Sequence, residues 1–405
     1  MAIDVLTNLT NVTQSKYDRT IPLYQNNMTK LISMMDKGKI VSFDSEDYFK
    51  IPFQFKLPEG SCNSGEYDGT NNGFPTALSA GYLQLRMAWA KWQGIISLSE
   101  EQIDLTKGAN VFVDGLRQNI NGMLKVYTLD QDTDAHLSGD GRVFAATDAP
   151  TLQVIPIDYP QFARIGMVLD GYASTDHDAD GVVVTKVDVA NNTITVTGTV
   201  TAVDENTVFY KEGTHDGTSA NASANGLSNI IDDDTGTFQN LSRDTYSYVQ
   251  AVVKDGDSAG TAQAFTLTRL RQLLDAMMES EGAELPDVLY GSPGVRNAYI
   301  DTITDENVPN ETIVKKAGQV AIPVYVYDDK AIEIQSSVRC IPNTMFALNK
   351  KHLLKYFGKF KWDKTGGLLK PTGSGAAFYA WCSAWQQFGT DFPKKNGRLN
   401  DITET

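Results

Sequence analysis

The apolar positions near the start of the chain follow two matching β-strand patterns. Residues 49–57 alternate strictly between apolar and polar side chains, and residues 83–89 do the same. A period of two predicts strands with one buried face. The stretch at 58–82 is rich in Gly, Asn and Ser and is too long for a tight turn, so it predicts an extended hairpin. The apolar face of this hairpin consists of Phe49, Ile51, Phe53, Phe55, Leu57, Leu83, Leu85, Met87 and Trp89.

An extended hairpin of this kind contains few residues that could pack against its own apolar face. We therefore expect it to bury that face on a neighbouring subunit, and we interpret its apolar residues as candidates for inter-subunit contacts. This pattern favours a building block of an assembly over an enzyme.

Apolar spacings of three and four predict helices elsewhere in the chain. The longest predicted helix lies within 99–137, and shorter ones cover 24–35, 268–281 and 293–302. The stripe of the long helix is formed by Phe112, Leu116, Ile120, Met123, Leu124 and Tyr127.

Strand patterns dominate the rest of the chain. Short β-type runs separated by Gly and Asn-Asn turns fill 165–212, which predicts a small β-barrel or meander inserted in a larger domain. Further strands are predicted at 286–290, 320–327 and 332–334, and the aromatic density of 345–405 predicts a second core. Helices and strands that do not alternate as βαβ units indicate an α+β fold.

Composition narrows the class of protein. The 405 residues are 41% apolar, which suffices for two or three lobes, and the formal net charge is −15. So acidic a chain is poorly suited to gripping a phosphate backbone. Its cysteines, Cys62, Cys340 and Cys382, contain no CxxC pair and favour neither a disulfide framework nor a zinc site. No signal-peptide pattern or membrane-length apolar run is visible, so we expect synthesis in the cytoplasm and no membrane partner.

One acidic motif resembles part of a calcium-binding loop. Asp176, Asp178 and Asp180, followed by Gly181, match the first half of that loop, but position twelve is Val187 instead of the closing glutamate. We therefore expect an acidic turn between two strands and no metal site, with the three aspartates as the candidate ligands if a metal binds.

Other candidate chemistry is weaker. Asp130, Asp132, Asp134 and His136 lie at the predicted end of the long helix, where carboxylates oppose the helix dipole. No HExxH, GxSxG, Walker A or strand-linked GxGxxG motif occurs, so we expect no catalytic residue, no cofactor and no enzymatic activity. The lysines and aromatic residues at 350–364 fit a nucleic-acid surface or a solvated basic face, and the acidity of the chain favours the latter.

In the order of its parts, the chain resembles the tailed-phage major capsid proteins of the Hong Kong 97-type fold. The arm, hairpin and long helix follow one another as in that family, and several short sequence segments are also similar. They are GLSNI at 226–230, GTFQNLSR at 236–243, PDVLY at 286–290 and VRNAY at 295–299.

The resemblance implies a division of the chain into named parts. These are an N-terminal arm (1–46), an extended loop (47–98), a peripheral domain with a long spine helix (99–140), an axial domain (141–340, with the β-rich insertion at 165–212) and a C-terminal return to the peripheral domain (341–405).

The resemblance also implies a function and partners. Hexamers and pentamers of the chain would close into an icosahedral head around double-stranded DNA without sequence-specific binding. The other implied partners are a scaffolding protein, a portal and a decoration protein. Because the arm begins directly at residue 1, we expect the scaffolding protein to be separate. The implied location is the virion capsid, after synthesis in the bacterial host cytoplasm.

Two other classes remain open on the residues alone. A phage tail or baseplate protein would share the acidic, cysteine-poor, β-rich composition but would form rings or tubes. A secreted β-rich calcium-binding adhesin would give a use to the Asp176–Gly181 segment, although the absence of a signal-peptide pattern disfavours it.

Overall fold

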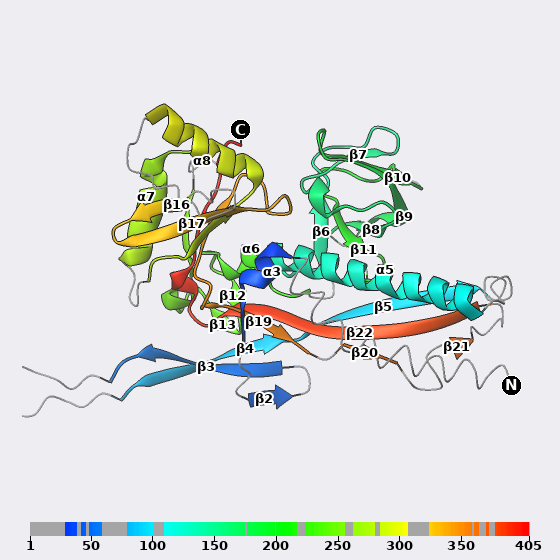
Figure 1. Cartoon of the computed structure of the whole chain (residues 1–405), viewed down its shortest axis with the longest axis horizontal. Helices are drawn as coiled ribbons and strands as arrows, with labels where there is room; N and C mark the ends of the chain where they lie inside the picture. Colours follow the sequence, from blue (N-terminus) through cyan, green and yellow to red (C-terminus); the bar gives the residue numbers. More distant parts are fainter. Residues whose placement is uncertain are drawn as a thin grey trace, which may run out of the picture.

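The structure, a computed structural model, shows distinct lobes arranged around one long helix (Figure 1). The mixture of few helices with many mainly antiparallel strands confirms the predicted α+β class. The structure describes residues 29–38, 42–45, 48–58, 79–99, 109–174, 176–198, 200–216, 223–255, 262–279, 284–306, 324–358, 360–363, 370–371 and 377–404.

The long helix α5 (Ala109–His136) lies along two long antiparallel strands, β5 (Ala90–Ser99) and β22 (Ala377–Thr390) (Figure 1). Trp92 of β5 packs on Tyr127 of α5, with ring centroids 4.6 Å apart, and fixes the helix against the sheet. The same sheet contains β1 (Asp36–Lys37), β19 (Leu353–Phe357), β20 (Lys361–Trp362) and β21 (Lys370–Pro371).

The predicted hairpin exists but is shorter than expected. Strand β3 (Tyr48–Lys56) pairs with β4 (Gly81–Ala88), and β2 (Ser42–Ser45) adds a third strand (Figure 1). Residues 90–98, expected in the extended loop, instead belong to β5 of the sheet beneath α5. Only Trp89 separates β4 from β5, and the buried positions change here from odd in β4 (Leu85, Met87) to even in β5 (Ala90, Ile96). The alternation of residues 83–89 therefore ends where the chain passes from one sheet into the next.

A second lobe is a six-stranded mixed sheet with two helices, and we call it the axial lobe because most of it falls within the expected axial domain. Its strand order is β14-β23-β18-β15-β17-β16, and α7 (Leu267–Met278) and α8 (Pro293–Glu306) match the helices predicted at 268–281 and 293–302. The strands are β14 (Val252–Lys254), β15 (Val288–Gly291), β16 (Val324–Tyr327), β17 (Lys330–Ser336), β18 (Met345–Leu348) and β23 (Gly397–Leu399).

Because β18 and β23 lie in the axial sheet, residues 341–405 do not all return to the peripheral domain. Strand β18 pairs with β15 on one side and β23 on the other, while β19 and β22 lie in the sheet beneath α5. The C-terminal part of the chain therefore crosses between the two lobes.

The inserted lobe is a closed six-stranded β-barrel. Its order is β6-β11-β8-β9-β10-β7, and the Ala146–Ile157 bridge joins the last strand to the first. The barrel begins well before the predicted residue 165, and it encloses its own apolar core around Phe144, Phe162 and Phe209. Its strands are β6 (Arg142–Ala145), β7 (Val154–Pro156), β8 (Val168–Ala173), β9 (Asp176–Asp188), β10 (Thr193–Thr197) and β11 (Val208–Lys211).

Short elements link the lobes. They are α3 (Lys30–Met34), η1 (Pro160–Phe162), α6 (Leu227–Ile230), β12 (Thr237–Phe238), β13 (Leu241–Ser242), η2 (Ser247–Val249) and η3 (Pro393–Lys395).

A single core joins the two ends of the chain. Leu31 of α3 and Phe49 of β3 pack in the same buried cluster as Phe346, Tyr356 and Phe388. The C-terminal aromatic residues were expected to form a second core, but these three complete a core that begins near the N-terminus. Sequence position alone could not reveal this, because hydrophobic contacts do not depend on chain separation.

Candidate assembly surfaces and the polar junction

The hairpin separates into a buried base and an exposed end. Phe49, Ile51, Leu85 and Met87 are buried within the chain's own core, and Phe49 lies 4.7 Å from the ring of Tyr356. The base of the hairpin therefore packs in the core of its own chain. This differs from the expectation that the whole apolar face contacts a neighbouring subunit.

The far end of the hairpin keeps its apolar side chains accessible. Leu57 is 72% exposed, and Tyr82, which the strand pattern did not single out, is 66% exposed. Phe55 is also exposed, although its ring stacks on Tyr248 at 5.5 Å. Leu83 and Trp89 are partly buried against the core, and the side chain of Phe53 lies outside the described residues.

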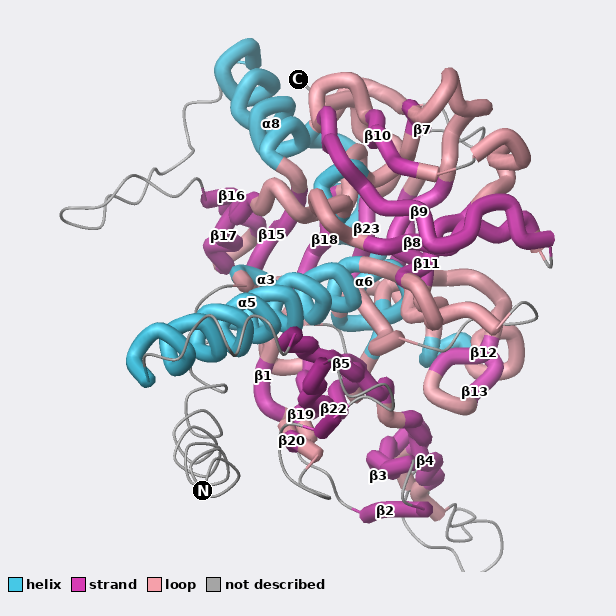
Figure 2. Tube along the Cα trace, turned by 90° about the vertical axis from the view of Figure 1, so that its right-hand side faces the viewer, coloured by secondary structure: helices cyan, strands magenta, loops and turns pink. Residues whose placement is uncertain are grey.

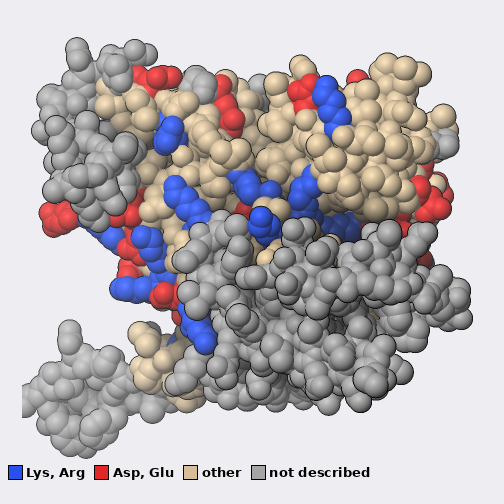
Figure 3. Space-filling model, turned by 45° about the vertical axis from the view of Figure 1, so that its right-hand side comes forward, with Lys and Arg blue, Asp and Glu red and all other residues tan. Residues whose placement is uncertain are grey.

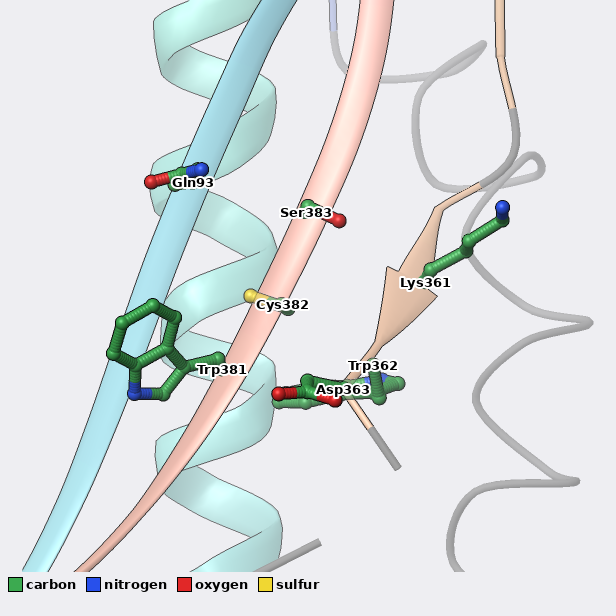
Figure 4. Close-up of a pocket in the computed structure, with 7 residues that line it drawn as sticks. All are labelled: Gln93, Lys361, Trp362, Asp363, Trp381, Cys382 and Ser383. Carbon is green, nitrogen blue, oxygen red and sulfur yellow. The ribbon is translucent and has the colours of Figure 1, made fainter. Parts of the chain in front are cut away.

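A second apolar surface lies on the sheet face that points away from α5. Ile95 of β5 and Trp381 of β22 are cross-strand partners and are 56% and 47% exposed. Because side chains alternate along a strand and Trp92 faces α5, Ile95 faces the opposite side. A cavity of about 320 Å³ opens beside them (Figure 4). It is lined by Gln93, Lys361, Trp362, Asp363, Trp381, Cys382 and Ser383.

The cavity carries no activated nucleophile. Burial raises the pKa of the Cys382 thiol to about 12, and its Sγ donates to the Gly94 carbonyl at 3.4 Å. At neutral pH this sulfur stays protonated, and thiol chemistry requires the thiolate.

The C-terminal turns of α5 form a buried polar junction, which we define as Asp130, Asp132, Asp134 and His136 with their partners. Asp130, Asp132 and His136 are each less than a tenth exposed. Carboxylates at a helix C-terminus are disfavoured by the helix dipole, so they need compensating partners. Each finds them on a different element.

Asp130 joins α5 to the barrel and to the sheet. Its carboxylate accepts from Arg164 at 2.5 Å, from Lys211 at 2.5 Å and from the indole of Trp92 at 2.9 Å. Burial opposes ionisation of Asp130, but the two cations and the hydrogen bonds outweigh it and lower its pKa. This carboxylate is therefore held charged.

Asp132 joins α5 to the loop that precedes β18. Arg339 donates to Asp132 at 2.6 Å and to the hydroxyl of Thr133 at 2.7 Å. The same guanidinium also donates to the carbonyls of Leu129 and Gln161. One arginine thus holds the helix, the η1 segment of the barrel lobe and the axial lobe together.

His136 and Asp134 complete the junction, and burial favours the neutral form of both side chains. Burial lowers the pKa of His136, so the neutral imidazole donates from Nδ1 to the Asp132 carbonyl at 2.7 Å. Its Nε2 then accepts from the Tyr290 hydroxyl at 2.9 Å. Asp134 accepts from Gln386 of β22 at 2.7 Å, and burial raises the pKa of this carboxyl group to about 7.

A glycine permits the closest contact at this junction. Gly226, just before α6, lies so near the end of α5 that an added Cβ would meet the carbonyl oxygens of Asp134 and Leu137 at 2.3 and 2.2 Å. Ser228 then donates to the His136 carbonyl at 2.9 Å, which satisfies one of the unpaired helix-end groups.

The junction residues do not converge on one metal position, because their side chains engage different partners. The sequence pattern did not predict the partners of these residues, which are Arg164, Lys211, Arg339, Gln386 and Tyr290. A signal was nevertheless present, since the i, i+3/i+4 stripe that includes Leu124 and Tyr127 continues to Gln131 and Asp134.

The predicted calcium-loop aspartates lie on β9 rather than in a turn. Asp176 pairs in register with Ala173, and Asp178 accepts from the Thr207 hydroxyl at 2.6 Å. Asp180 lies 3.9 Å from the imidazole of His177. The three side chains therefore have separate surroundings.

Several basic side chains on the surface have an acidic partner. Figure 3 shows basic side chains in a central band of one face, with acidic ones around it. Arg142 pairs with Asp158 within the barrel region at 3.1 Å, and Arg398 of β23 pairs with Asp232 after α6 at 3.2 Å. In the basic stretch, Lys350 and Lys351 contact Glu333 and Glu284 at 3.5 Å each. Such pairing leaves less positive charge for a phosphate backbone.

The helices within the described ranges include none with the length and apolarity that a bilayer crossing requires.

Comparison with known proteins identifies the fold. No family model matches the chain, and no curated protein matches its sequence. Among solved structures, a chain of the capsid asymmetric unit of cyanophage A-1(L) is similar with a TM-score of 0.50 and 12% identity, covering 93% of this chain and 94% of that one. The chain therefore has the fold of a Hong Kong 97-type phage major capsid protein.

Two further solved structures are also similar. The capsid of the Myoviridae phage XM1 has a TM-score of 0.46 and 8% identity, covering 93% of this chain and 92% of that one. An encapsulin complex from Synechococcus elongatus has a TM-score of 0.44 and 8% identity, with coverages of 93% and 89%.

Proposed function

We propose that this chain is the major capsid protein of a tailed bacteriophage and assembles as hexamers and pentamers into an icosahedral head around double-stranded DNA. The observation that carries the proposal is the hairpin, whose base is locked into the core while Leu57 and Tyr82 at its far end stay exposed. The capsid-type fold supports the same function. The role is structural rather than enzymatic, and the protein resides in the virion.

The exposed surface beneath the spine helix is a suitable acceptor for the hairpin end. Ile95 and Trp381 offer an apolar patch next to a cavity, away from the chain's own hairpin end (Figures 1 and 4). An end that contacts this patch on the next copy forms a heterologous contact, and repetition of such a contact closes a ring. Apolar area removed from water supplies roughly 25 cal/mol per Å², so each contact is modest and the summed shell is stable.

The further partners follow from the same proposal. A separate scaffolding protein, a portal and a decoration protein would act on a shell of this type, and the net charge of −15 would keep its wall from adhering to packaged DNA.

Electron microscopy of the purified protein tests the function. Closed round shells, formed alone or on addition of a scaffolding protein from the same phage, are the expected result. Tubes or open rings would favour a tail or baseplate protein. Dispersed monomers under all these conditions would contradict the capsid assignment.

A further inference from the structure

The β8–β9 hairpin of the barrel carries a set of metal-ligating side chains outside the assembly surfaces. Figure 2 shows this hairpin standing out from the barrel. Asp170 on β8 and His177 and Asp180 on β9 each offer one donor atom, and these atoms lie within 4.8 Å of one another.

Two of the three donors are held in place by their surroundings. Asp170 is buried, and its two oxygens accept from the backbone amides of Gly181 at 3.0 Å and Gly213 at 3.2 Å. A carboxylate has about four acceptor positions, so both oxygens keep lone pairs for a further partner. The His177 ring stacks almost parallel on Tyr172, with centroids 4.4 Å apart and planes 4° apart.

The third donor is free to adjust. The Asp180 side chain is largely exposed, and its carboxylate lies 3.9 Å from Nε2 of His177. Two carboxyl groups, those of Asp170 and Asp180, and one imidazole make up the donor set.

We propose that Asp170, His177 and Asp180 bind a divalent first-row transition cation such as Zn²⁺. A triangle with sides of 4.8 Å has its centre about 2.8 Å from each corner, while Zn–N and Zn–O bonds are about 2.0–2.2 Å. Small movements of the three side chains, largest for the exposed Asp180, close that gap. The imidazole selects for such a metal, because Ca²⁺ and Mg²⁺ prefer oxygen ligands alone.

The proposed donor set differs from the calcium-loop motif in the sequence. Asp176 and Asp178 are excluded from it, and Asp178 is already engaged by Thr207. Irregular register between β8 and β9, with shifts on both sides of Gly171, separates these positions from Asp180. The proposed donor set therefore keeps Asp180 of the motif and contains the buried Asp170 and His177 instead of Asp176 and Asp178.

Calorimetric titration of ZnCl₂ into chelator-treated, dialysed full-length protein tests the site. We expect saturable binding by the wild type, and a loss of at least about tenfold in affinity for His177→Ala and for Asp180→Asn. Both side chains are on the surface, so circular dichroism should show an unchanged fold. CaCl₂ should bind at least about tenfold more weakly than ZnCl₂.

The matched control is His215→Ala. His215 stacks on the same tyrosine, at 3.9 Å, but does not belong to the donor set. This variant should keep the wild-type affinity. Absence of saturable Zn²⁺ binding, an equal loss on His215→Ala, or unchanged binding by the His177 and Asp180 variants would each overturn the proposal.

Discussion

The polar junction and the end of the hairpin use their side chains in opposite ways. At the junction, charged groups are buried, and partners from the barrel, the sheet and the axial lobe engage them. At the hairpin end, apolar Leu57 and Tyr82 are exposed to solvent. The usual rule of apolar inside and polar outside is reversed at both places.

The difference follows from what each region must join. The junction connects lobes of one chain, where directional ion pairs and hydrogen bonds fix one relative arrangement. The hairpin end is proposed to meet another copy, where non-directional apolar contact allows association to be reversed and corrected. Substitutions should therefore act on folding at the junction and on assembly at the hairpin end.

Arg339→Ala should produce one of the two largest effects on folding. It removes the cation that pairs with buried Asp132 at 2.6 Å and leaves that charge without its main partner. Loss of one partner of a buried ion pair costs about 3–5 kcal/mol in unfolding free energy. Urea unfolding of the unassembled wild-type and variant subunits measures this loss of unfolding free energy.

Arg142→Ala is the control for that variant. Its ion pair with Asp158 is comparably close, at 3.1 Å, but both side chains are more than a fifth exposed. A pair of this kind contributes about 1 kcal/mol or less. Equal losses for the two arginines would show that burial at the junction has no special importance.

Asp134→Asn should change how stability depends on pH. The pKa of Asp134 is raised from 3.8 to about 7 in the folded protein, so between these values the folded state holds a proton that the unfolded state releases. Wild-type stability should therefore fall as pH rises from about 4 to about 7. Asparagine resembles the protonated acid and should remove this contribution, on the order of 1–3 kcal/mol at pH 8.

Urea midpoints at pH 5 and pH 8 provide the measurement. The urea midpoint of the variant should exceed that of the wild type at pH 8, and the two midpoints should differ little at pH 5. A constant difference across the range would mean that Asp134 ionises normally.

The double substitution Leu57→Ser with Tyr82→Ser should have the smallest effect on folding. Both side chains are exposed, so the unfolding free energy should change by less than about 0.5 kcal/mol. Shells should nevertheless fail to form, which electron microscopy would show.

Phe49→Ala is the matched change at the base of the same hairpin. Phe49 is fully buried, with Trp89 and Tyr356 at 4.9 and 4.7 Å, so its loss should destabilise the subunit by about 3–5 kcal/mol. Normal shells from the double variant would refute the assembly role of the hairpin end.

The sequence predicted elements whose signals are local. The stripe through Leu270, Leu273 and Leu274 gave the helix α7, and the alternation after Phe49 gave the strand β3, because periodicity reports directly on one buried face. The order of arm, hairpin and long helix gave the capsid-type fold. It did not give the change of sheet at Trp89, because the switch of buried positions from odd in β4 to even in β5 does not say which sheet the second strand joins.

The sequence by itself determined the strands, the helices and the acidic composition, because these depend on neighbours along the chain. Tertiary structure alone decided which charges are paired, as in Arg339 with Asp132 and Gln386 with Asp134, which are separated by 207 and 252 residues. It also decided that Phe49 is buried while Leu57 is exposed, although one alternating pattern includes both. The physical reason is that burial and ion pairing depend on distance in space, which a one-dimensional pattern does not contain.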